Sequence, residues 1–198
     1  SLSFDVSDKT AVFDSLGNLP DDFKKIDILI NNAGNAHGLN PIHEGDVEDW
    51  DKMVDINVKG LLYVSRAILP GMVQKKSGHI INIGSIAGRE AYPKGNVYCA
   101  SKFAVHAISE SMRLDLNEHG IKVSEVKPGA VNTEFSEVRF KGDRDKAGKV
   151  YEGFTPLKAN DVAEVIYFIA SCPEHVNIAD ILVLPTAQAS AGIVNRKK

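Results

Sequence analysis

Short apolar runs alternate with longer helical patterns along the whole chain. Runs with the length and composition of strands cover residues 2–6, 26–30, 79–84, 121–126 and 181–184. Helical periodicity follows at residues 8–16, 46–69, 97–119 and 161–171. Strands that alternate with helices predict an α/β fold with a parallel sheet, in a single domain over residues 1–198.

The same patterns predict how these elements are covered. The run at 26–30 is almost wholly apolar, which is typical of a strand buried on both faces. The helical patterns around Asn57 and after Tyr98 are apolar on more than one face, so one sheet cannot cover them. We therefore expect a homotetramer formed through these two helices, with coverage by the protein's own loops as the alternative.

Polar residues interrupt the alternation at several points. From residue 133 to 153 the pattern is polar and broken, which predicts a lid-like excursion from the core. Ser7 and Asp46 stand where helix N-caps are expected, and Gly120 stands where a helix ends. Asn57 lies inside a helical pattern although asparagine is a weak helix former, so a specific role is expected for it.

Composition excludes several classes of function. A net charge of −3 gives no basic surface for nucleic acid, and no apolar run reaches the length of a membrane span. Cys99 and Cys172 lie in apolar helical patterns, which indicates reduced thiols in a cytoplasmic protein. The six histidines show no metal-ligand spacing, so we predict no metal site.

Candidate chemistry centres on residues 85–102. Ser85 follows a predicted strand, and Tyr98 and Lys102 lie one turn apart at the start of the next helix. A nearby cation lowers the pKa of a phenol, and a base that titrates closer to the working pH transfers protons better. Taken alone, the Tyr98 and Lys102 pair is also common on ordinary surface helices.

Polar turns follow the other predicted strands as well. Asp5 and Val6 end the first strand, Asn32 to Gly34 follow the second, and Pro128 with Gly129 follow the fourth. Each turn by itself is explained as a cap or a tight turn. Because open parallel sheets bind ligands at the carboxyl ends of their strands, the joint pattern predicts a binding site there.

In this order the motifs are specific for one family. They are Asn31-Asn32-Ala33-Gly34, the helical Asn57, Ser85, Tyr98-x-x-x-Lys102 and Pro128-Gly129-x-Val131-x-Thr133. With them the chain resembles the short-chain dehydrogenase/reductase family over essentially its whole length. The resemblance implies a Rossmann-type doubly wound parallel sheet. It also implies an enzyme that transfers a hydride between a nicotinamide cofactor and a small hydroxy or carbonyl substrate.

The resemblance implies a role for each catalytic residue. Tyr98 moves the proton to or from the substrate hydroxyl, and Ser85 hydrogen-bonds the reacting oxygen. Lys102 holds the nicotinamide ribose and lowers the pKa of Tyr98. Asn57 anchors a water that links Lys102 to solvent.

The cofactor-binding residues are implied in the same way. Besides Tyr98 and Lys102 they are Asp5 and Val6 for the adenine, Asn32, Ala33 and Gly34 for the adenosine side, and Pro128, Gly129, Val131 and Thr133 for the nicotinamide carboxamide.

A narrower resemblance concerns the substrate. Residues 83–89 and 133–143 are similar to those of the 3-hydroxy acid dehydrogenases, which act on serine and allo-threonine and in some cases reduce malonic semialdehyde. This group implies NADP as cofactor, and the sequence does not exclude NAD. Arg139, between Phe135 and Phe140 in the expected lid, is a candidate for binding a substrate carboxylate. A solvated arginine is the alternative.

The sequence departs from the family at one motif. The glycine-rich phosphate loop is absent, and the partial match Gly34-x-x-x-Gly38 follows the wrong strand and is better explained as a turn. We expect about 50 further residues before Ser1, with two strands and that loop, since the strands ending at Asp5 and Asn31 would be the third and fourth of the fold.

The two alternatives to an oxidoreductase are a serine hydrolase and a non-catalytic relative. A serine hydrolase needs Gly-x-Ser-x-Gly, whereas Gly84 directly precedes Ser85 and Gly88 lies three residues later. A non-catalytic relative that senses NAD(P) or acts as a scaffold on the same fold stays open as the alternative to the enzyme.

Overall fold

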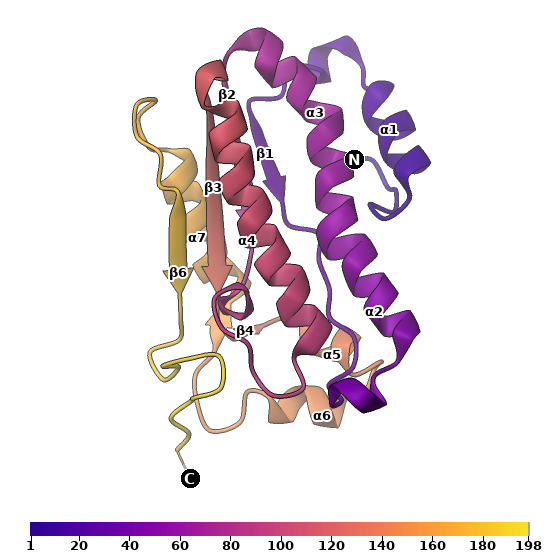
Figure 1. Cartoon of the computed structure of the whole chain (residues 1–198). Coiled ribbons are helices and arrows are strands. Elements are labelled where there is room, and N and C mark those ends of the chain that lie inside the picture. Colours follow the sequence, from indigo (N-terminus) through magenta and orange to yellow (C-terminus); the bar gives the residue numbers. More distant parts are fainter. Residues whose placement is uncertain (198) are drawn as a thin grey trace.

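The computed structural model describes residues 1–197, and its core is a four-stranded sheet with the order β1–β2–β3–β6 (Figure 1). The strands are β1 Ile28–Asn31, β2 Gly78–Ile83, β3 Ile121–Pro128 and β6 Asp180–Val183. Every neighbouring pair in this sheet is parallel. The predicted α/β fold with a parallel sheet is therefore confirmed.

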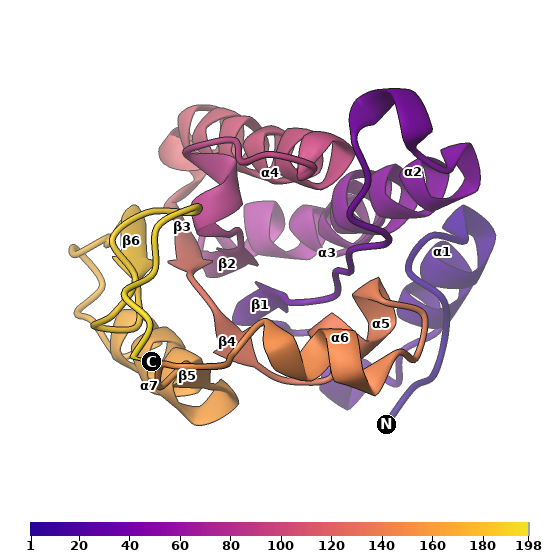
Figure 2. The ribbon, with the colours of Figure 1, turned by 90° about the horizontal axis from the view of Figure 1, so that it is seen from below.

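Helices cover the two faces of the sheet unequally (Figures 1 and 2). α3 (Leu61–Lys75) and α4 (Asn96–Leu116) pack on one face, where α1 (Lys9–Gly17) lies against α3 and α2 (Val47–Val54) lies against α4. α7 (Ala159–Ala170) packs on the opposite face. Because side chains alternate along a strand, Val123 of β3 enters the core under α3 and α4 while Val126 packs under α7.

The predicted burial of the strand at residues 26–30 on both faces is wrong for β1. Leu29 packs against the core under α3 and α4, but Ile28 and Ile30 on the other face are 43% and 45% exposed. The apolar residues that pack against α7 come from β2, β3 and β6 and from residues close to these strands. α7 therefore does not cover the face of β1 that carries Ile28 and Ile30.

The predicted strand at residues 2–6 is also wrong. These residues have no strand partner among residues 1–197, and the chain turns at Val6 and Ser7 before α1 begins. The helix is capped by Asp8, whose carboxylate accepts from the Ala11 N–H, and not by Ser7. Asp46 caps α2 as predicted, and Gly120 ends the helical region after α4 with a φ of 67°.

The helical pattern that begins at Asp46 is not one continuous α-helix. A π-helical segment, Asp55–Gly60, separates α2 from α3 and contains Asn57. Widened turns of this kind are rare and are found mostly at functional sites. α3 then continues through Pro70 and ends at Lys76, which adopts a left-handed conformation.

The segment at residues 133–153 contains two short helices, α5 (Phe135–Arg139) and α6 (Arg144–Lys149). It lies between β4 (Val131–Asn132) and β5 (Leu157–Lys158), which pair in parallel as a separate two-stranded sheet. Figure 2 shows this segment passing across the end of the molecule where β2 and β3 end.

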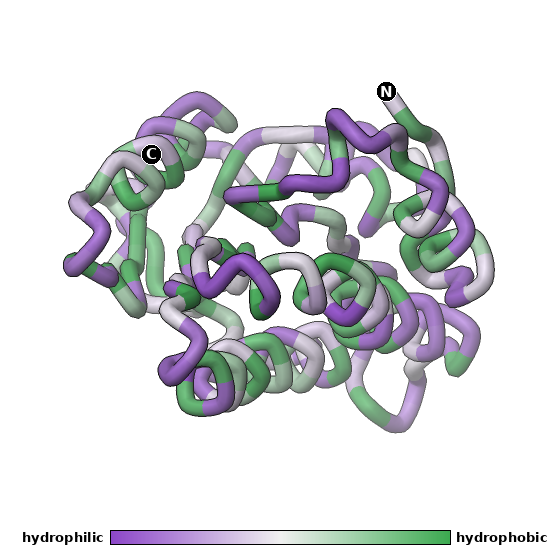
Figure 3. The backbone as a smooth tube through the Cα atoms, turned by 90° about the horizontal axis from the view of Figure 1, so that it is seen from above, coloured by the Kyte–Doolittle hydropathy of each residue, from purple (hydrophilic) through white to green (hydrophobic). Residues whose placement is uncertain are grey.

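Apolar and polar residues alternate around the helices (Figure 3). Several large apolar side chains stay outside the core, namely Leu62 on α3, Phe103 and Leu114 on α4, and Tyr167 and Phe168 on α7. Within residues 1–197, no helix is both long enough and apolar enough to cross a bilayer.

Candidate active site

A cleft of about 750 Å³ lies at the carboxyl ends of β2 and β3. The predicted site residues that line it are Asn32, Gly34, Ser85, Tyr98, Lys102, Pro128, Gly129, Val131 and Thr133. These residues are far apart in the sequence and meet because parallel strands end at the same edge of the sheet. The remaining predicted residues, Asp5, Val6, Ala33, Asn57 and Arg139, are outside the cleft lining.

Ser85 stands two residues after the last residue of β2, Ile83, and is 8% exposed. Its hydroxyl accepts a hydrogen bond from the Ala87 N–H at 3.1 Å and so caps a short 3₁₀ turn, Ile86–Gly88. A Cβ at Gly88 would lie 2.6 Å from the Lys102 carbonyl oxygen, so glycine is required for this turn to pack on α4. The turn thus holds Ser85 against the helix that carries Tyr98 and Lys102.

Tyr98 is buried, and burial raises the pKa of its phenol to about 12. The Ser85 hydroxyl and the positive charge of Arg139 oppose this rise in pKa without cancelling it. On balance the pKa of Tyr98 is therefore raised, and not lowered as the Tyr98 and Lys102 pair predicts, because the loss of solvation of a buried phenolate is the larger effect.

The ammonium group of Lys102 donates a hydrogen bond to the Ile83 carbonyl oxygen at 2.9 Å. The residue is 7% exposed, and burial lowers the pKa of its amine to about 8, while the negative charge of Glu125 acts in the opposite direction. Lys102 is thus anchored to the end of β2, beside the cleft that it shares with Tyr98.

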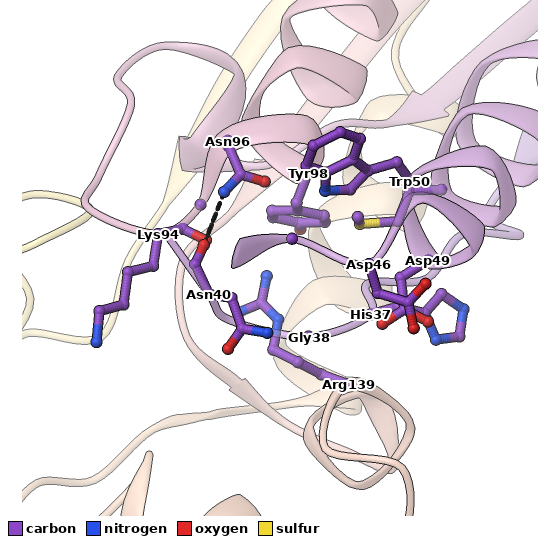
Figure 4. A pocket seen from close by; sticks show the side chains of 13 residues that line it. His37, Gly38, Asn40, Asp46, Asp49, Trp50, Lys94, Asn96, Tyr98 and Arg139 are labelled. Carbon is purple, nitrogen blue, oxygen red and sulfur yellow. Dashed lines mark hydrogen bonds between the residues drawn. The ribbon is translucent and has the colours of Figure 1, made fainter. Parts of the chain in front are cut away.

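Arg139 lies on the other side of the Tyr98 ring, in a small adjoining pocket (Figure 4). Its guanidinium carbon is 4.8 Å from the centroid of the Tyr98 ring and 5.3 Å from that of Phe135. Nη2 donates to the Tyr92 hydroxyl at 2.9 Å, and the buried Nε has no hydrogen-bond partner within the described residues 1–197. The structure therefore brings Arg139 to the ring of Tyr98, although not into the cleft lining.

The 133–153 segment is fastened to the loop that follows β1. Lys141 forms ion pairs with Asp49 at 2.9 Å and Asp46 at 3.3 Å, and the Gly38 N–H donates to the Arg139 carbonyl at 2.9 Å. The Gly34-x-x-x-Gly38 stretch lies in an irregular loop with no assigned turn, and Gly38 has a φ of 65°, which favours glycine.

Asn57 acts as a bridge between the loop after β1 and α4. Its side chain accepts from the Asn35 N–H and donates to the Asn35 carbonyl, both at 2.8 Å, and also donates to the Ser101 hydroxyl at 3.0 Å. These contacts explain a buried asparagine within a helix, because it pairs backbone groups that would otherwise lack partners.

The N-terminal candidates lie apart from this site. Asp5 accepts hydrogen bonds from the backbone and the hydroxyl of Ser7. The side chain of Val6 packs against Gly60, at the end of the π-helical segment that contains Asn57. Neither residue follows a strand, so the argument that placed them at a strand end does not hold.

Two groups of residues near the site were missed by sequence reasoning. Four apolar residues of α7 line the cleft, namely Ala159, Val162, Ala163 and Ile166, and nothing in an amphipathic pattern marks them as ligand contacts. Under the cleft, the Asn31 amide donates to Asn82 at 2.8 Å and the Asn82 amide donates to Ser109 at 2.9 Å. These hydrogen bonds could have been suspected from the sequence, because an asparagine within an apolar strand needs a buried hydrogen-bond partner.

Comparison with known proteins identifies the family. The model of the short chain dehydrogenase family matches residues 1–144. The chain belongs to the short-chain dehydrogenase family. This confirms the predicted family, its Rossmann-type fold and the prediction of an oxidoreductase.

Individual relatives cover nearly the whole chain. The NADP-dependent 3-hydroxy acid dehydrogenase YdfG of Salmonella typhi is 48% identical over 98% of this chain and 78% of its own length. The NADP-dependent 3-hydroxy acid dehydrogenase of Schizosaccharomyces pombe is 44% identical over 100% of this chain and 76% of its own. The closed form of serine dehydrogenase complexed with NADP⁺ superposes with a TM-score of 0.94 at 45% identity, over 100% of this chain and 80% of that one.

Proposed function

We propose that the chain is an NADP-dependent oxidoreductase that interconverts a small 3-hydroxy acid, such as serine, allo-threonine or 3-hydroxypropionate, and the corresponding carbonyl compound. The observation that carries this proposal is that Ser85, Tyr98 and Lys102 line one cleft at the strand ends. Relatives that are 44–48% identical are named NADP-dependent 3-hydroxy acid dehydrogenases, which supports both the substrate class and the cofactor.

The residues of the cleft fit the nicotinamide half of such a cofactor. Lys102 supplies a cation for a ribose hydroxyl, and the backbone after β3, from Pro128 to Thr133, offers polar groups for a carboxamide. Gly34 and Gly129 let other side chains pack closely against the backbone of the cleft, since a Cβ at Gly34 would lie 3.2 Å from Asn57 Oδ1 and a Cβ at Gly129 would collide with Gln188. When bound, the nicotinamide supplies or accepts the hydride, and the protein provides orientation and electrostatics.

The side chains then handle the oxygen and its proton. Ser85 hydrogen-bonds the substrate oxygen, and Tyr98 takes the hydroxyl proton during oxidation or returns it during reduction. Because burial favours the neutral phenol, oxidation depends on the cations near Tyr98, which stabilise the phenolate. Arg139 stacks on that ring and Lys102 shares its cleft, so both contribute to this stabilisation.

Arg139 is proposed to bind the carboxylate of the substrate. The support is its position against Tyr98 and its buried Nε, which has no partner in the protein. A guanidinium group binds a carboxylate through two parallel hydrogen bonds. We further propose that the 133–153 segment acts as a lid that carries Arg139 to the substrate and excludes water.

Replacement of the proton donor tests the mechanism. Tyr98→Phe is expected to lower turnover by about 10²–10⁴-fold while cofactor affinity changes little. Tyr167→Phe is the matched control, because it removes a phenolic hydroxyl from a side chain that is 75% exposed on α7. Near-normal turnover of Tyr98→Phe would refute the mechanism.

The unmodified protein distinguishes an enzyme from a non-catalytic sensor. Tight NADP binding without turnover of any small hydroxy acid by the unmodified protein would favour the non-catalytic sensor.

Replacement of Arg139 tests the recognition of the carboxylate. In Arg139→Ala, the KM for a 3-hydroxy acid is expected to rise much more than the KM for its neutral methyl ester. Arg144→Ala is the control, because Arg144 lies in the same segment and its side chain is 83% exposed. An equal rise in KM for the acid and the ester would show that Arg139 does not bind the carboxylate.

We also propose a cytoplasmic homotetramer assembled through the helices that contain Asn57 and follow Tyr98. The apolar side chains left outside the core support this assembly, since Leu62, Phe103 and Leu114 are 40%, 42% and 79% exposed. Both cysteines are free thiols, as expected in a reducing compartment. A monomeric mass by light scattering at micromolar concentration would rule the tetramer out.

A further inference from the structure

A cluster of charged side chains lies beneath the active site, on the face of the sheet that α4 covers. It contains His106 of α4, Glu125 and Lys127 of β3, and Asp180 of β6. The Glu125 and Lys127 side chains are each only 1% exposed. Buried charges are costly unless they are paired, so the arrangement of these groups has to be accounted for in full.

Lys127 is the cation at the centre of this cluster. Its ammonium group lies 3.0 Å from Glu125 Oε2 and also pairs with Asp180 Oδ2. His106 Nδ1 lies 2.7 Å from Glu125 Oε2 and 3.0 Å from Lys127 Nζ. Ligand-type atoms of His106, Glu125 and Asp180 come within 4.8 Å of one another, but the position between them is taken by the ammonium of Lys127.

The carboxylates of the cluster differ in their exposure to solvent. Glu125 is 1% exposed, whereas Asp180 is 38% exposed. Glu110, which lies 3.8 Å from His106 Nε2, is 60% exposed. Glu125 is therefore the carboxylate of this cluster that is removed from solvent, and the surroundings of both its oxygens have to be accounted for.

One oxygen of Glu125 lies outside these ion pairs. Oε2 is used by His106 and Lys127, whereas the buried Oε1 has no hydrogen-bond partner among residues 1–197. Oε1 lies against Gly84, so closely that a Cβ at that position would collide with it. Gly84 directly follows Ile83, whose carbonyl accepts the hydrogen bond from Lys102. The free carboxylate oxygen thus lies under the part of the backbone that anchors the active-site ammonium.

We propose that Glu125 is a positioning residue that keeps Lys102 protonated, as the buried counter-charge of the active-site ammonium. The charged groups paired with Glu125 or with its partners are His106, Lys127 and Asp180, while its Oε1 lies against Gly84, next to the carbonyl that binds Lys102. Burial by itself favours the neutral amine of Lys102, and the charge of Glu125 acts against that loss of charge. The proposal rests on the proposed function, in which a charged Lys102 helps to stabilise the Tyr98 phenolate.

The pKa of Lys102 can be measured directly and without turnover. Competitive labelling of the free protein with acetic anhydride across a range of pH, read by mass spectrometry, gives the apparent pKa of the Lys102 amine. Glu125→Gln is expected to lower this pKa by about 1 or more, because an anion close to it has been removed. Glu110→Gln removes a carboxylate at the edge of the same cluster, from a side chain that is 60% exposed, and is expected to leave the Lys102 pKa unchanged.

The pH dependence of oxidation provides the second measurement. In Glu125→Gln, the pH at which the rate falls on the alkaline side should move down by the same shift, because neutral Lys102 no longer stabilises the phenolate. Glu125→Asp keeps the charge but withdraws it from Gly84, so a smaller shift of the same sign is expected. This variant serves as the test if Glu125→Gln does not fold.

The outcomes separate this proposal from the proposed function. An unchanged Lys102 pKa in the folded Glu125→Gln or Glu125→Asp protein would overturn the role of Glu125, even if Tyr98→Phe is inactive as expected. Loss of turnover at all pH values, without a shift of the Lys102 pKa, would show a purely structural role for Glu125 and would also overturn the proposal. A protein that turns over no hydroxy acid at all would refute the proposed function, while the labelling measurement would still decide the role of Glu125.

Discussion

Truncation of Asn57 is a sensitive test of how the cleft is held in shape. Asn57 is 2% exposed and makes three hydrogen bonds, two with the backbone of Asn35 and one with the Ser101 hydroxyl. Asn57→Ala removes all three and leaves their partners without a replacement in the protein. Asn35 follows Gly34, which lines the cleft, so the loss is expected to affect both stability and cofactor binding.

The size of the effect follows from the partners that are left behind. A buried polar group that loses its only partner costs about 1–3 kcal/mol. Asn35 is half-buried, so water can replace part of the loss there, and Ser101 keeps its hydrogen bond to the Tyr98 carbonyl. We therefore take the low end of that range for each of the three bonds, which gives about 3 kcal/mol in total. For a domain of this size, that corresponds to a fall in Tm of roughly 6–12 °C.

Thermal unfolding and steady-state kinetics of Asn57→Ala provide the measurement. The KM for the cofactor is expected to rise more than kcat falls, since the variant releases the loop and leaves Tyr98 and Ser85 in place. Asn160→Ala is the control, because it removes an exposed amide that pairs with Glu164 on α7, and its stability should change by less than about 0.5 kcal/mol. A fall in Tm below about 2 °C together with an unchanged cofactor KM would refute the bridging role of Asn57.

Two further predictions concern the 133–153 segment and the sheet. Lys141→Ala removes the ion pairs to the buried Asp49 and to Asp46, so the KM for substrate should rise severalfold with little change in kcat. An unchanged KM would show that these ion pairs do not hold the segment in place. His79 is 4% exposed, and burial lowers its pKa from 6.5 to about 4. As the pH falls, His79 therefore becomes protonated in the unfolded chain before it does so in the folded protein. The free energy of unfolding should fall by about 3 kcal/mol between about pH 6.5 and about pH 4. Melting curves across this range for the unmodified protein and for His79→Gln test the prediction, and an equal loss of stability in both would contradict it.

Much of the fold and of the site could be predicted from the sequence because the determining signals are local. The apolar runs that correspond to β1, β2, β3 and β6 could be recognised because apolar residues are buried in the core while the polar residues around them are exposed to solvent. Ser85, Tyr98 and Lys102 could be found for a similar reason. A polar residue at a strand end and a pair one helical turn apart occupy positions that the backbone geometry of each element dictates.

Pairing between segments could not be predicted in the same way. Residues 2–6 have the composition of a strand, but a strand forms only through hydrogen bonds to a neighbour, and the described residues provide none. The apolar face of β1 is likewise open because no helix covers Ile28 and Ile30, which no pattern within the strand reveals. Asn57 was singled out as a polar residue in a helix, yet only the fold showed that it binds the backbone of Asn35.

The electrostatics of the site depend on the tertiary structure most of all. The sequence placed a lysine one turn from Tyr98 and predicted a lowered pKa, but the folded protein buries the phenol and raises its pKa to about 12. In the sequence, Glu125 and Lys127 are simply two charged residues within a predicted strand. The packing of α4 and β6 against β3 brings them together with His106 and Asp180 in one cluster. Local sequence determines which side chain stands at which position of a helix or strand. Solvation and the distances between charges are properties of the assembled interior, so tertiary structure alone decided the direction in which the pKa of Tyr98 shifts and which charges became neighbours.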